Sequence, residues 1–214
     1  MKTFSEEQIL SAFTSGWNAH MLSNEGSYHD RVKALNKFSS TFTKPVRIIF
    51  LDIDGVLNNS MDSDRHIGED DAKGRLYSPR CVELLNKLTC RSGAKIVVSS
   101  TWRMGRSFEE MASVLKHIGV EGEMIGMTDV LNDMDTFRGN EILKWIKDNP
   151  DIVGDNYLFR DYVILDDDSD MLLWQKDNYV NCDPTVGMTD RTVYKALSIL
   201  LNAPCEDVGQ EFVQ

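Results

Sequence analysis

The sequence is poor in cysteine and histidine and has no long hydrophobic segment. Its 214 residues include four cysteines and four histidines, and the cysteines are scattered without a Cys-x-x-Cys pair. This pattern disfavours both a disulfide framework and a zinc site. No apolar stretch approaches the roughly 18 residues of a membrane span, and the N-terminus lacks the apolar core of a signal peptide. We therefore expect a cytoplasmic protein with no membrane partner.

Positive charge is also in short supply. The chain has 23 Lys and Arg residues against 34 Asp and Glu residues, for a formal net charge of −11. Non-specific binding of long nucleic acids depends on basic residues that displace counterions from phosphates, so this balance argues against it. A local basic rim stays compatible with the total, and its candidates are Arg75, Arg80, Arg103 and Arg106.

Residues 1–44 are predicted to form a helical extension. Apolar residues recur every four positions from Ile9 to Trp17, as on an amphipathic helix, and Pro45 marks the boundary. The apolar stripe packs either onto the main domain or against a partner, which leaves oligomerisation through this segment open. We predict three parts: the extension over 1–44, a main domain over 45–204 and an acidic C-terminal tail over 205–214.

Strand and helix patterns alternate along the main domain. The segments "VRIIFLD" (46–52), "KIVVSS" (95–100) and "YVILDD" (162–167) are short apolar runs, typical of parallel strands buried on both faces. Ser78 followed by Pro79 marks the start of a helix between the first two strands. Short connections between alternating elements predict an α/β fold, a three-layer Rossmann-like parallel sheet.

Polar residues follow each of these three strands. They are Asp52 and Asp54 after the first, Ser99 and Ser100 after the second, and Asp166, Asp167, Asp168 and Asp170 after the third. Ligands of such sheets bind beyond the carboxyl ends of the strands, so we expect these side chains to meet. Crowded carboxylates raise one another's pKa unless a cation compensates them. Oxygen ligands without Cys or His favour Mg²⁺.

A carboxylate site with Mg²⁺ suits phosphoryl transfer. Acids two positions apart on an extended segment project to the same side, so one of the pair Asp52 and Asp54 can attack phosphorus while the other protonates the leaving oxygen. Ser99 offers a neutral hydroxyl to a phosphoryl oxygen. A cation is also needed at the transferring group; Arg138 is the first candidate and Lys144 the second.

Three segments carry a family resemblance. "DIDGVLN", "KIVVSSTWR" and "VILDDDSD" resemble motifs I, II and IV of the haloacid dehalogenase (HAD) superfamily of phosphohydrolases, over about Val46 to Leu201. "SPRCVELLN", "RGNEILKWI" and "DPTVGMT" are similar to a subgroup of small, capless HAD domains in RNA-repair and phage polynucleotide kinase-phosphatase proteins. The resemblance implies a Mg²⁺-dependent phosphomonoester hydrolase that works through an aspartyl-phosphate.

The resemblance also implies roles for individual acids. Asp52 becomes the nucleophile and a metal ligand, and Asp54 becomes the general acid and later base, with its backbone carbonyl on the metal. Asp167 becomes the direct ligand of motif IV, with Asp166 beside it and Asp170 one shell further out.

The phosphate-binding residues match the motifs of the HAD superfamily less fully than the acids do. Ser99, with Ser100 beside it, takes the phosphate-binding place of motif II. The usual motif III lysine is missing from its expected place, and Arg138 is the proposed substitute. Trp102 and Arg103 have two interpretations: they contact substrate, with Arg103 reaching a phosphate, or they start an ordinary helix with a packed tryptophan.

The spacing of the motifs leaves no room for a folded cap domain, so we expect an open site with a flap over residues 66–76. An open site admits bulky substrates. Nucleotides and similar phosphorylated small molecules are the first candidates, and the 3′-phosphate of a polynucleotide end is the second. The alternative of another class is a non-catalytic HAD-fold module that binds a partner or senses nucleotides.

Overall fold

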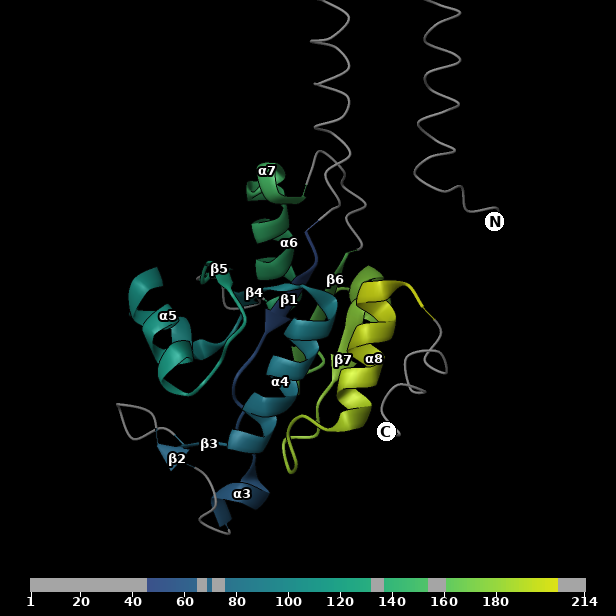
Figure 1. Ribbon diagram of the computed structural model, residues 1–214. Helices are drawn as coiled ribbons and strands as arrows, with labels where there is room; N and C mark the ends of the chain where they lie inside the picture. The colour runs from purple at the N-terminus through teal and green to yellow at the C-terminus, as the bar shows by residue number, and fades with distance from the viewer. Residues whose placement is uncertain (1–45, 65–68, 71–75, 132–136, 154–160, 204–214) are drawn as a thin grey trace, which may run out of the picture. The chain divides into compact units, whose positions relative to one another are not determined.

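The computed structural model describes residues 46–64, 69–70, 76–131, 137–153 and 161–203 (Figure 1). These residues belong to the second of the two units into which the chain divides, residues 45–214. The predicted extension over 1–44, the predicted tail over 205–214 and most of the predicted flap lie outside the described residues. The domain boundaries therefore stay a prediction.

Five parallel strands form the sheet, in the order β5-β4-β1-β6-β7. Their bounds are β1 (Ile48–Leu51), β4 (Lys95–Val98), β5 (Met124–Met127), β6 (Tyr162–Asp166) and β7 (Tyr179–Asn181). The three apolar runs of the sequence are the three central strands, and β1 and β6 are buried throughout. Leu51 lies opposite Val98 on one side and Leu165 on the other, so these strands end at one level. The predicted α/β fold with a parallel sheet is confirmed.

Helices cover both faces of this sheet (Figure 1). The longer ones are α4 (Pro79–Ser92), α5 (Phe108–His117), α6 (Arg138–Asp148) and α8 (Asp190–Leu201). One apolar cluster joins alternate strand residues to α4, α5 and α8, and a second joins the others to α6. The three-layer arrangement follows, because each strand is apolar on both faces. None of the described helices has the length and hydrophobicity that a membrane span needs.

The start of α4 agrees with its sequence signal. Ser78 is the N-cap, its hydroxyl accepts a hydrogen bond from the Cys81 N–H at 3.4 Å, and Pro79 occupies the first turn. Gly93 ends the helix with a φ of +66°. Short elements complete the described part: α3 (Ser60–Asp64), β2 (Glu69–Asp70), β3 (Leu76–Tyr77), η1 (Thr101–Arg103), α7 (Pro150–Val153) and η2 (Leu173–Asn178).

Candidate active site

Three carboxylates meet beyond the carboxyl ends of β1 and β6. Asp52 follows β1 directly, Asp166 is the last residue of β6, and Asp167 follows it. Each offers an oxygen atom, and these atoms lie within 4.8 Å of one another. The parallel pairing of Leu51 with Leu165 places the two strand ends side by side, which is what brings the acids together.

Burial makes this cluster electrostatically costly. It is the main cause that raises the pKa of Asp52 to about 6, although a hydrogen bond from Ser100 and the charge of Arg138 oppose it. Burial, and then the charge of Asp52, raise the pKa of Asp166 to about 8. The pKa of Asp167 is also raised, chiefly by burial. Three acids of this kind in one place are a donor set that a hard divalent cation fits.

A buried carboxylate oxygen without a hydrogen-bond partner among the described residues also favours a bound cation. Oδ2 of Asp166 is buried and accepts no hydrogen bond from the described residues, while Nε of Arg138 lies 3.5 Å from it. Buried polar atoms are rarely left without a partner, because each costs desolvation free energy. The residues present therefore fit a bound Mg²⁺.

Arg138 brings positive charge to the same place. It begins α6, and its Nη2 lies 3.9 Å from Oδ1 of Asp52. Its backbone N–H donates to Oδ2 of Asp170 at 2.9 Å, so Asp170 ties the helix to the segment after β6. Lys144, the second candidate for this role, pairs instead with Asp129 at 2.8 Å and with Asp148. Arg138, rather than Lys144, is the cation beside the acids.

The carboxyl group of Asp54 lies apart from the three clustered acids. Its Oδ1 accepts hydrogen bonds from Nε1 of Trp102 at 2.9 Å and from Nδ2 of Asn58 at 2.8 Å. Its Oδ2 lies 3.3 Å from the hydroxyl of Thr101. The cluster within 4.8 Å includes neither Asp54 nor Asp170. The metal contact expected of Asp54 concerns its backbone carbonyl and stays a prediction.

Gly55 allows the chain to turn directly after these acids. Its φ is +69°, a left-handed conformation that glycine adopts without strain. A Cβ atom at this position would lie 2.4 Å from Oδ2 of Asp167. Both the turn and the close approach to Asp167 therefore require glycine.

The two serines after β4 lie in different environments. The backbone N–H of Ser99 donates to the carbonyl of Leu51 at 2.8 Å, and its buried hydroxyl makes no hydrogen bond with the described residues. The hydroxyl of Ser100 makes a hydrogen bond with Asp52, and it accepts a hydrogen bond from the backbone N–H of Trp102 at 3.3 Å. Ser100 therefore supports the acid cluster directly, whereas the hydroxyl of Ser99 has no hydrogen-bond partner in the described part of the chain.

Comparison with known families identifies the domain. A family model described as the HAD domain in Swiss Army Knife RNA repair proteins matches residues 48–193. The chain belongs to this HAD family. The match spans β1 to the first turns of α8 and so includes every residue of the candidate site. The resemblance seen in the sequence is confirmed.

Other comparisons add little to this HAD assignment. No curated protein matches the chain. A solved structure from Legionella pneumophila, described as a HAD superfamily hydrolase of subfamily III A, is 10% identical with a TM-score of 0.32. That alignment covers 87% of this chain and 100% of the other. A likeness at this TM-score carries no argument about the HAD domain described here.

Arg103 is buried and bonded to groups inside the domain. Its side chain is 4% exposed, and its guanidinium donates to the carbonyls of Thr128 at 2.7 Å and Ser100 at 2.6 Å. It also pairs with Glu141 at 2.7 Å. Because its Nε, Nη1 and Nη2 atoms all donate to groups of the domain itself, these contacts favour a structural role for Arg103, and phosphate binding by it stays a prediction. Glu141 in turn lies 3.3 Å from Nη1 of Arg138, which links Arg103 to the site.

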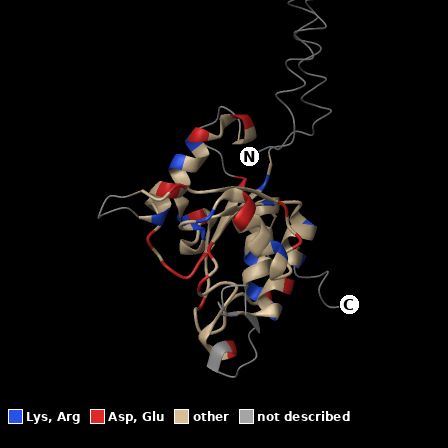
Figure 2. Ribbon diagram, turned by 90° about the vertical axis from the view of Figure 1, so that its left-hand side faces the viewer, with Lys and Arg blue, Asp and Glu red and all other residues tan. Residues whose placement is uncertain are grey.

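The expected basic rim is likewise reduced. Arg75 lies outside the described residues, and Arg80 donates to the carbonyls of Val186 at 2.6 Å and Met188 at 2.8 Å. Arg106 donates to the carbonyl of Trp102. Figure 2 shows Lys and Arg residues interspersed with Asp and Glu residues along the helices of the HAD domain. The described arginines of the expected rim therefore support the backbone.

Sequence reasoning missed three residues that touch the site. Asn58 and Thr101 contact Asp54, and Glu141 contacts Arg138. Asn58 and Glu141 lie in the segments "DIDGVLN" and "RGNEILKWI", but the resemblance assigns neither residue a role. The sequence allows Trp102 either substrate contact or packing. Its side chain is 2% exposed and packs in the core, and its Nε1–H donates to Asp54. The need of a buried indole N–H for an acceptor is the signal that could have connected Trp102 to Asp54.

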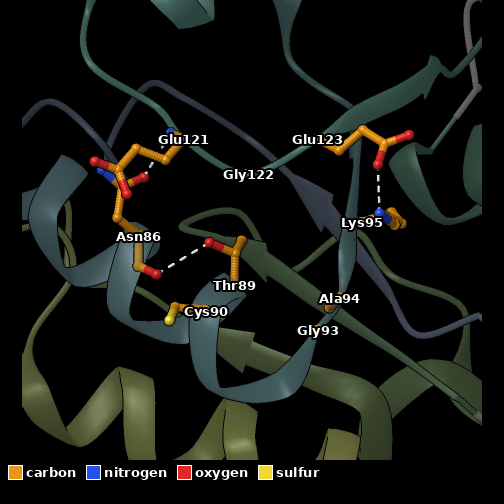
Figure 3. Close-up of a pocket in the computed structure, with 9 residues that line it drawn as sticks. All are labelled: Asn86, Thr89, Cys90, Gly93, Ala94, Lys95, Glu121, Gly122 and Glu123. Atoms are coloured by element: carbon orange, nitrogen blue, oxygen red, sulfur yellow. Dashed lines mark hydrogen bonds and ion pairs between the residues drawn. The ribbon is translucent and has the colours of Figure 1, made fainter.

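A hollow of about 350 Å³ lies at the opposite end of the sheet (Figure 3). It is lined by residues near the start of β4 and the end of α4, among them Lys95, Glu123 and Asn86. Lys95 pairs with Glu123, and the amide of Asn86 accepts a hydrogen bond from the Glu121 N–H at 2.9 Å. None of the acids of the candidate site lines this hollow.

Proposed function

We propose that this HAD domain is a phosphomonoester hydrolase in which Asp52 attacks the phosphorus atom of the substrate. The observation that carries the proposal is the meeting of Asp52 with Asp166 and Asp167 beside Arg138, at the carboxyl edge of a parallel sheet. A nucleophilic carboxylate needs nearby positive charge that offsets the negative charge of the phosphoryl group. At this edge of the sheet, Arg138 supplies such a charge, and the three acids would hold a cation that supplies more.

Asp52, Asp166 and Asp167 are the residues that would hold Mg²⁺. When bound, the ion supplies positive charge that offsets both the acids and the phosphoryl oxygens. The backbone carbonyl of Asp54 is a further proposed ligand. Asp170 is proposed to act one shell out, because its Oδ2 already accepts the Arg138 N–H.

The remaining residues divide the reaction between them. An Asp52 oxygen forms a bond to phosphorus while the bond from phosphorus to the leaving oxygen breaks, and Asp54 gives that oxygen a proton. A water then attacks the aspartyl-phosphate, Asp54 takes a proton from it, and inorganic phosphate and free Asp52 result. Arg138 and the hydroxyl of Ser99 are proposed to contact the phosphoryl oxygens during both steps.

We propose nucleotides and nucleotide-like phosphomonoesters as the substrates, in keeping with an acidic chain that carries no excess of basic residues. A second candidate is the 3′-phosphate of an RNA end. The description of the family, a HAD domain in RNA repair proteins, favours this candidate.

Phosphate release from a panel of phosphomonoesters tests the proposal. The panel contains 5′- and 3′-nucleotides, 3′-phosphorylated oligonucleotides and an aryl phosphate, each with Mg²⁺ and with EDTA. We expect Mg²⁺-dependent turnover by the wild type and none above background by Asp52→Asn. Asp168→Asn is the matched control, since Asp168 is an exposed acid of the same segment as Asp166; it should keep activity within about threefold. Mg²⁺ binding without turnover of any substrate would instead favour a binding or nucleotide-sensing module.

A further inference from the structure

The hydrogen bonds around Asp54 are distributed unequally between its two carboxylate oxygens. Oδ1 accepts from Trp102 at 2.9 Å and from Asn58 at 2.8 Å, whereas Oδ2 has the hydroxyl of Thr101 at 3.3 Å. Asp54 itself is exposed, so solvent and substrate can reach the carboxyl group. Three protein donors therefore surround an acid that solvent and substrate can also reach.

Both donors to Oδ1 are anchored independently of Asp54. Trp102 is 2% exposed and packs in the apolar cluster with α4, α5 and α8, so its ring is held by the core. The backbone N–H of Gly55 donates to Oδ1 of Asn58 at 2.8 Å, which fixes the amide so that its Nδ2 faces Asp54. Side chains locked in this way can hold a third group in one orientation.

The chemistry of the donors distinguishes the two oxygens. An indole N–H and an amide N–H can only donate, whereas a threonine hydroxyl can donate or accept. A proton on Oδ1 would have to displace Trp102 or Asn58. A proton on Oδ2 can be accommodated, because the hydroxyl of Thr101 can rotate to accept or give way to a substrate oxygen.

We propose that Trp102 and Asn58 are positioning residues that hold Oδ1 of Asp54, so that Oδ2 is the oxygen that exchanges a proton with the substrate. As the bond between phosphorus and the leaving oxygen breaks, the proton on Oδ2 passes to that oxygen, and the leaving group departs as a neutral alcohol. In the second step Oδ2 takes the proton of the attacking water. The inference rests on the proposed function and adds residues to its acid–base step.

Two substrates that differ in their need for a proton test it. Nitrophenolate leaves from p-nitrophenyl phosphate without protonation, whereas a ribose hydroxyl leaves from a nucleoside monophosphate only with a proton. The quantity to compare is kcat/KM, because it reports the steps up to departure of the leaving group. In Trp102→Phe, which keeps an aromatic ring and loses the N–H, we expect kcat/KM for a nucleoside monophosphate to fall about tenfold or more. For p-nitrophenyl phosphate it should fall less than about threefold.

Trp145→Phe is the matched control. Trp145 is also buried, at 7% exposure, but belongs to α6 and to the other apolar cluster, so its loss should change both substrates equally or neither. Thermal unfolding shows whether each variant is folded. Asn58→Ala, a change at a half-buried loop position, provides a second test and should show the same selective loss.

An equal loss on both substrates in folded Trp102→Phe and Asn58→Ala, or no loss on the nucleotide, would overturn the positioning role while leaving the proposed function intact. A wild-type protein that hydrolyses no member of the phosphomonoester panel would overturn the proposed function, and this inference with it.

Discussion

The polar side chains at the two ends of the parallel sheet are satisfied in different ways. At the amino ends, around the hollow of Figure 3, Lys95 pairs with Glu123, and Asn86 bonds to the backbone at Gly119 and Glu121. At the carboxyl ends, Asp52 and Asp166 have raised pKa values, and Oδ2 of Asp166 accepts no hydrogen bond from the described residues.

This difference is the one expected between a structural end of the sheet and the proposed functional end. Polar groups that pair with one another contribute modestly to stability and need no ligand to compensate their charge. Buried acids without full compensation cost folding free energy, and such groups concentrate at sites that bind a ligand. Substitutions at the two ends should therefore affect different properties, activity at the carboxyl end and at most stability at the amino end.

The largest effect is expected from Arg138→Gln, compared with Lys144→Gln. Arg138 lies beside Asp52 and Asp166, whereas Lys144 pairs with surface acids. Removing a preorganised cation from the transferring group should lower kcat about 10²–10³-fold. Lys144→Gln should retain wild-type kcat. Steady-state kinetics with the best substrate measures both, and equal effects of the two substitutions would contradict the assignment.

Gly55→Ala and Gly93→Ala sharpen the comparison at the level of the backbone. Their φ values are +69° and +66°, but a Cβ meets Asp167 at 2.4 Å in the first case and nothing within 4 Å in the second. Left-handed strain alone should cost Gly93→Ala about 1–2 kcal/mol in the free energy of unfolding. Gly55→Ala should cost more and also lower activity, because the added Cβ displaces Asp167. Denaturant unfolding and phosphate release measure the two effects; a fully active Gly55→Ala would refute the tight turn.

The pH dependence of stability should distinguish Asp166→Asn from the wild type in EDTA. Burial raises the pKa of Asp166 to about 8 in the folded protein, so the folded state binds this proton more tightly than the unfolded chain does. The stability that it contributes is present at low pH and is lost as the pH rises from about 4 to about 8. Asp166→Asn removes this loss.

The variant should therefore have a higher Tm than the wild type at pH 8 and no advantage at pH 4. Added Mg²⁺ should raise the Tm of the wild type at pH 8 and leave that of Asp166→Asn nearly unchanged. Scanning calorimetry across this pH range checks both statements. If the Tm values of the two proteins changed with pH in parallel, ionisation of Asp166 would carry no cost in stability.

The smallest effect is expected at the amino end. Glu123→Gln breaks the ion pair with Lys95. The side chain of Lys95 is 37% exposed and that of Glu123 is 64% exposed. An exposed ion pair contributes at most about 1 kcal/mol, so the free energy of unfolding should change little. Phosphate release should be unchanged. A clear loss of activity would mean that the two ends of the sheet are not functionally separate.

Much of the fold was predictable because its determinants are local. The β-branched runs at 46–52, 95–100 and 162–167 have the composition of strands buried on both faces, and they became β1, β4 and β6. Since parallel strands end at one edge, their terminal acids also had to come close, and Asp52, Asp166 and Asp167 do.

Side-chain direction was not predictable in the same way. Arg103 follows the motif II serines, and only the tertiary structure shows that it points to Glu141 and backbone carbonyls. Asn58 is four residues from Asp54 and Trp102 is 48 residues from it, and neither separation indicates that the side chain donates to Asp54. Arg138 was placed by the need for a cation, a chemical argument that does not depend on spacing.

Trapping the covalent intermediate tests the central claim most directly. The wild type is mixed with substrate and Mg²⁺, quenched in the first turnover and treated with borohydride, which reduces an aspartyl-phosphate to homoserine. Peptide mass spectrometry then identifies the modified residue. The account predicts homoserine at position 52 and nowhere else. Phosphate release without modification of Asp52, or modification of another acid, would contradict it.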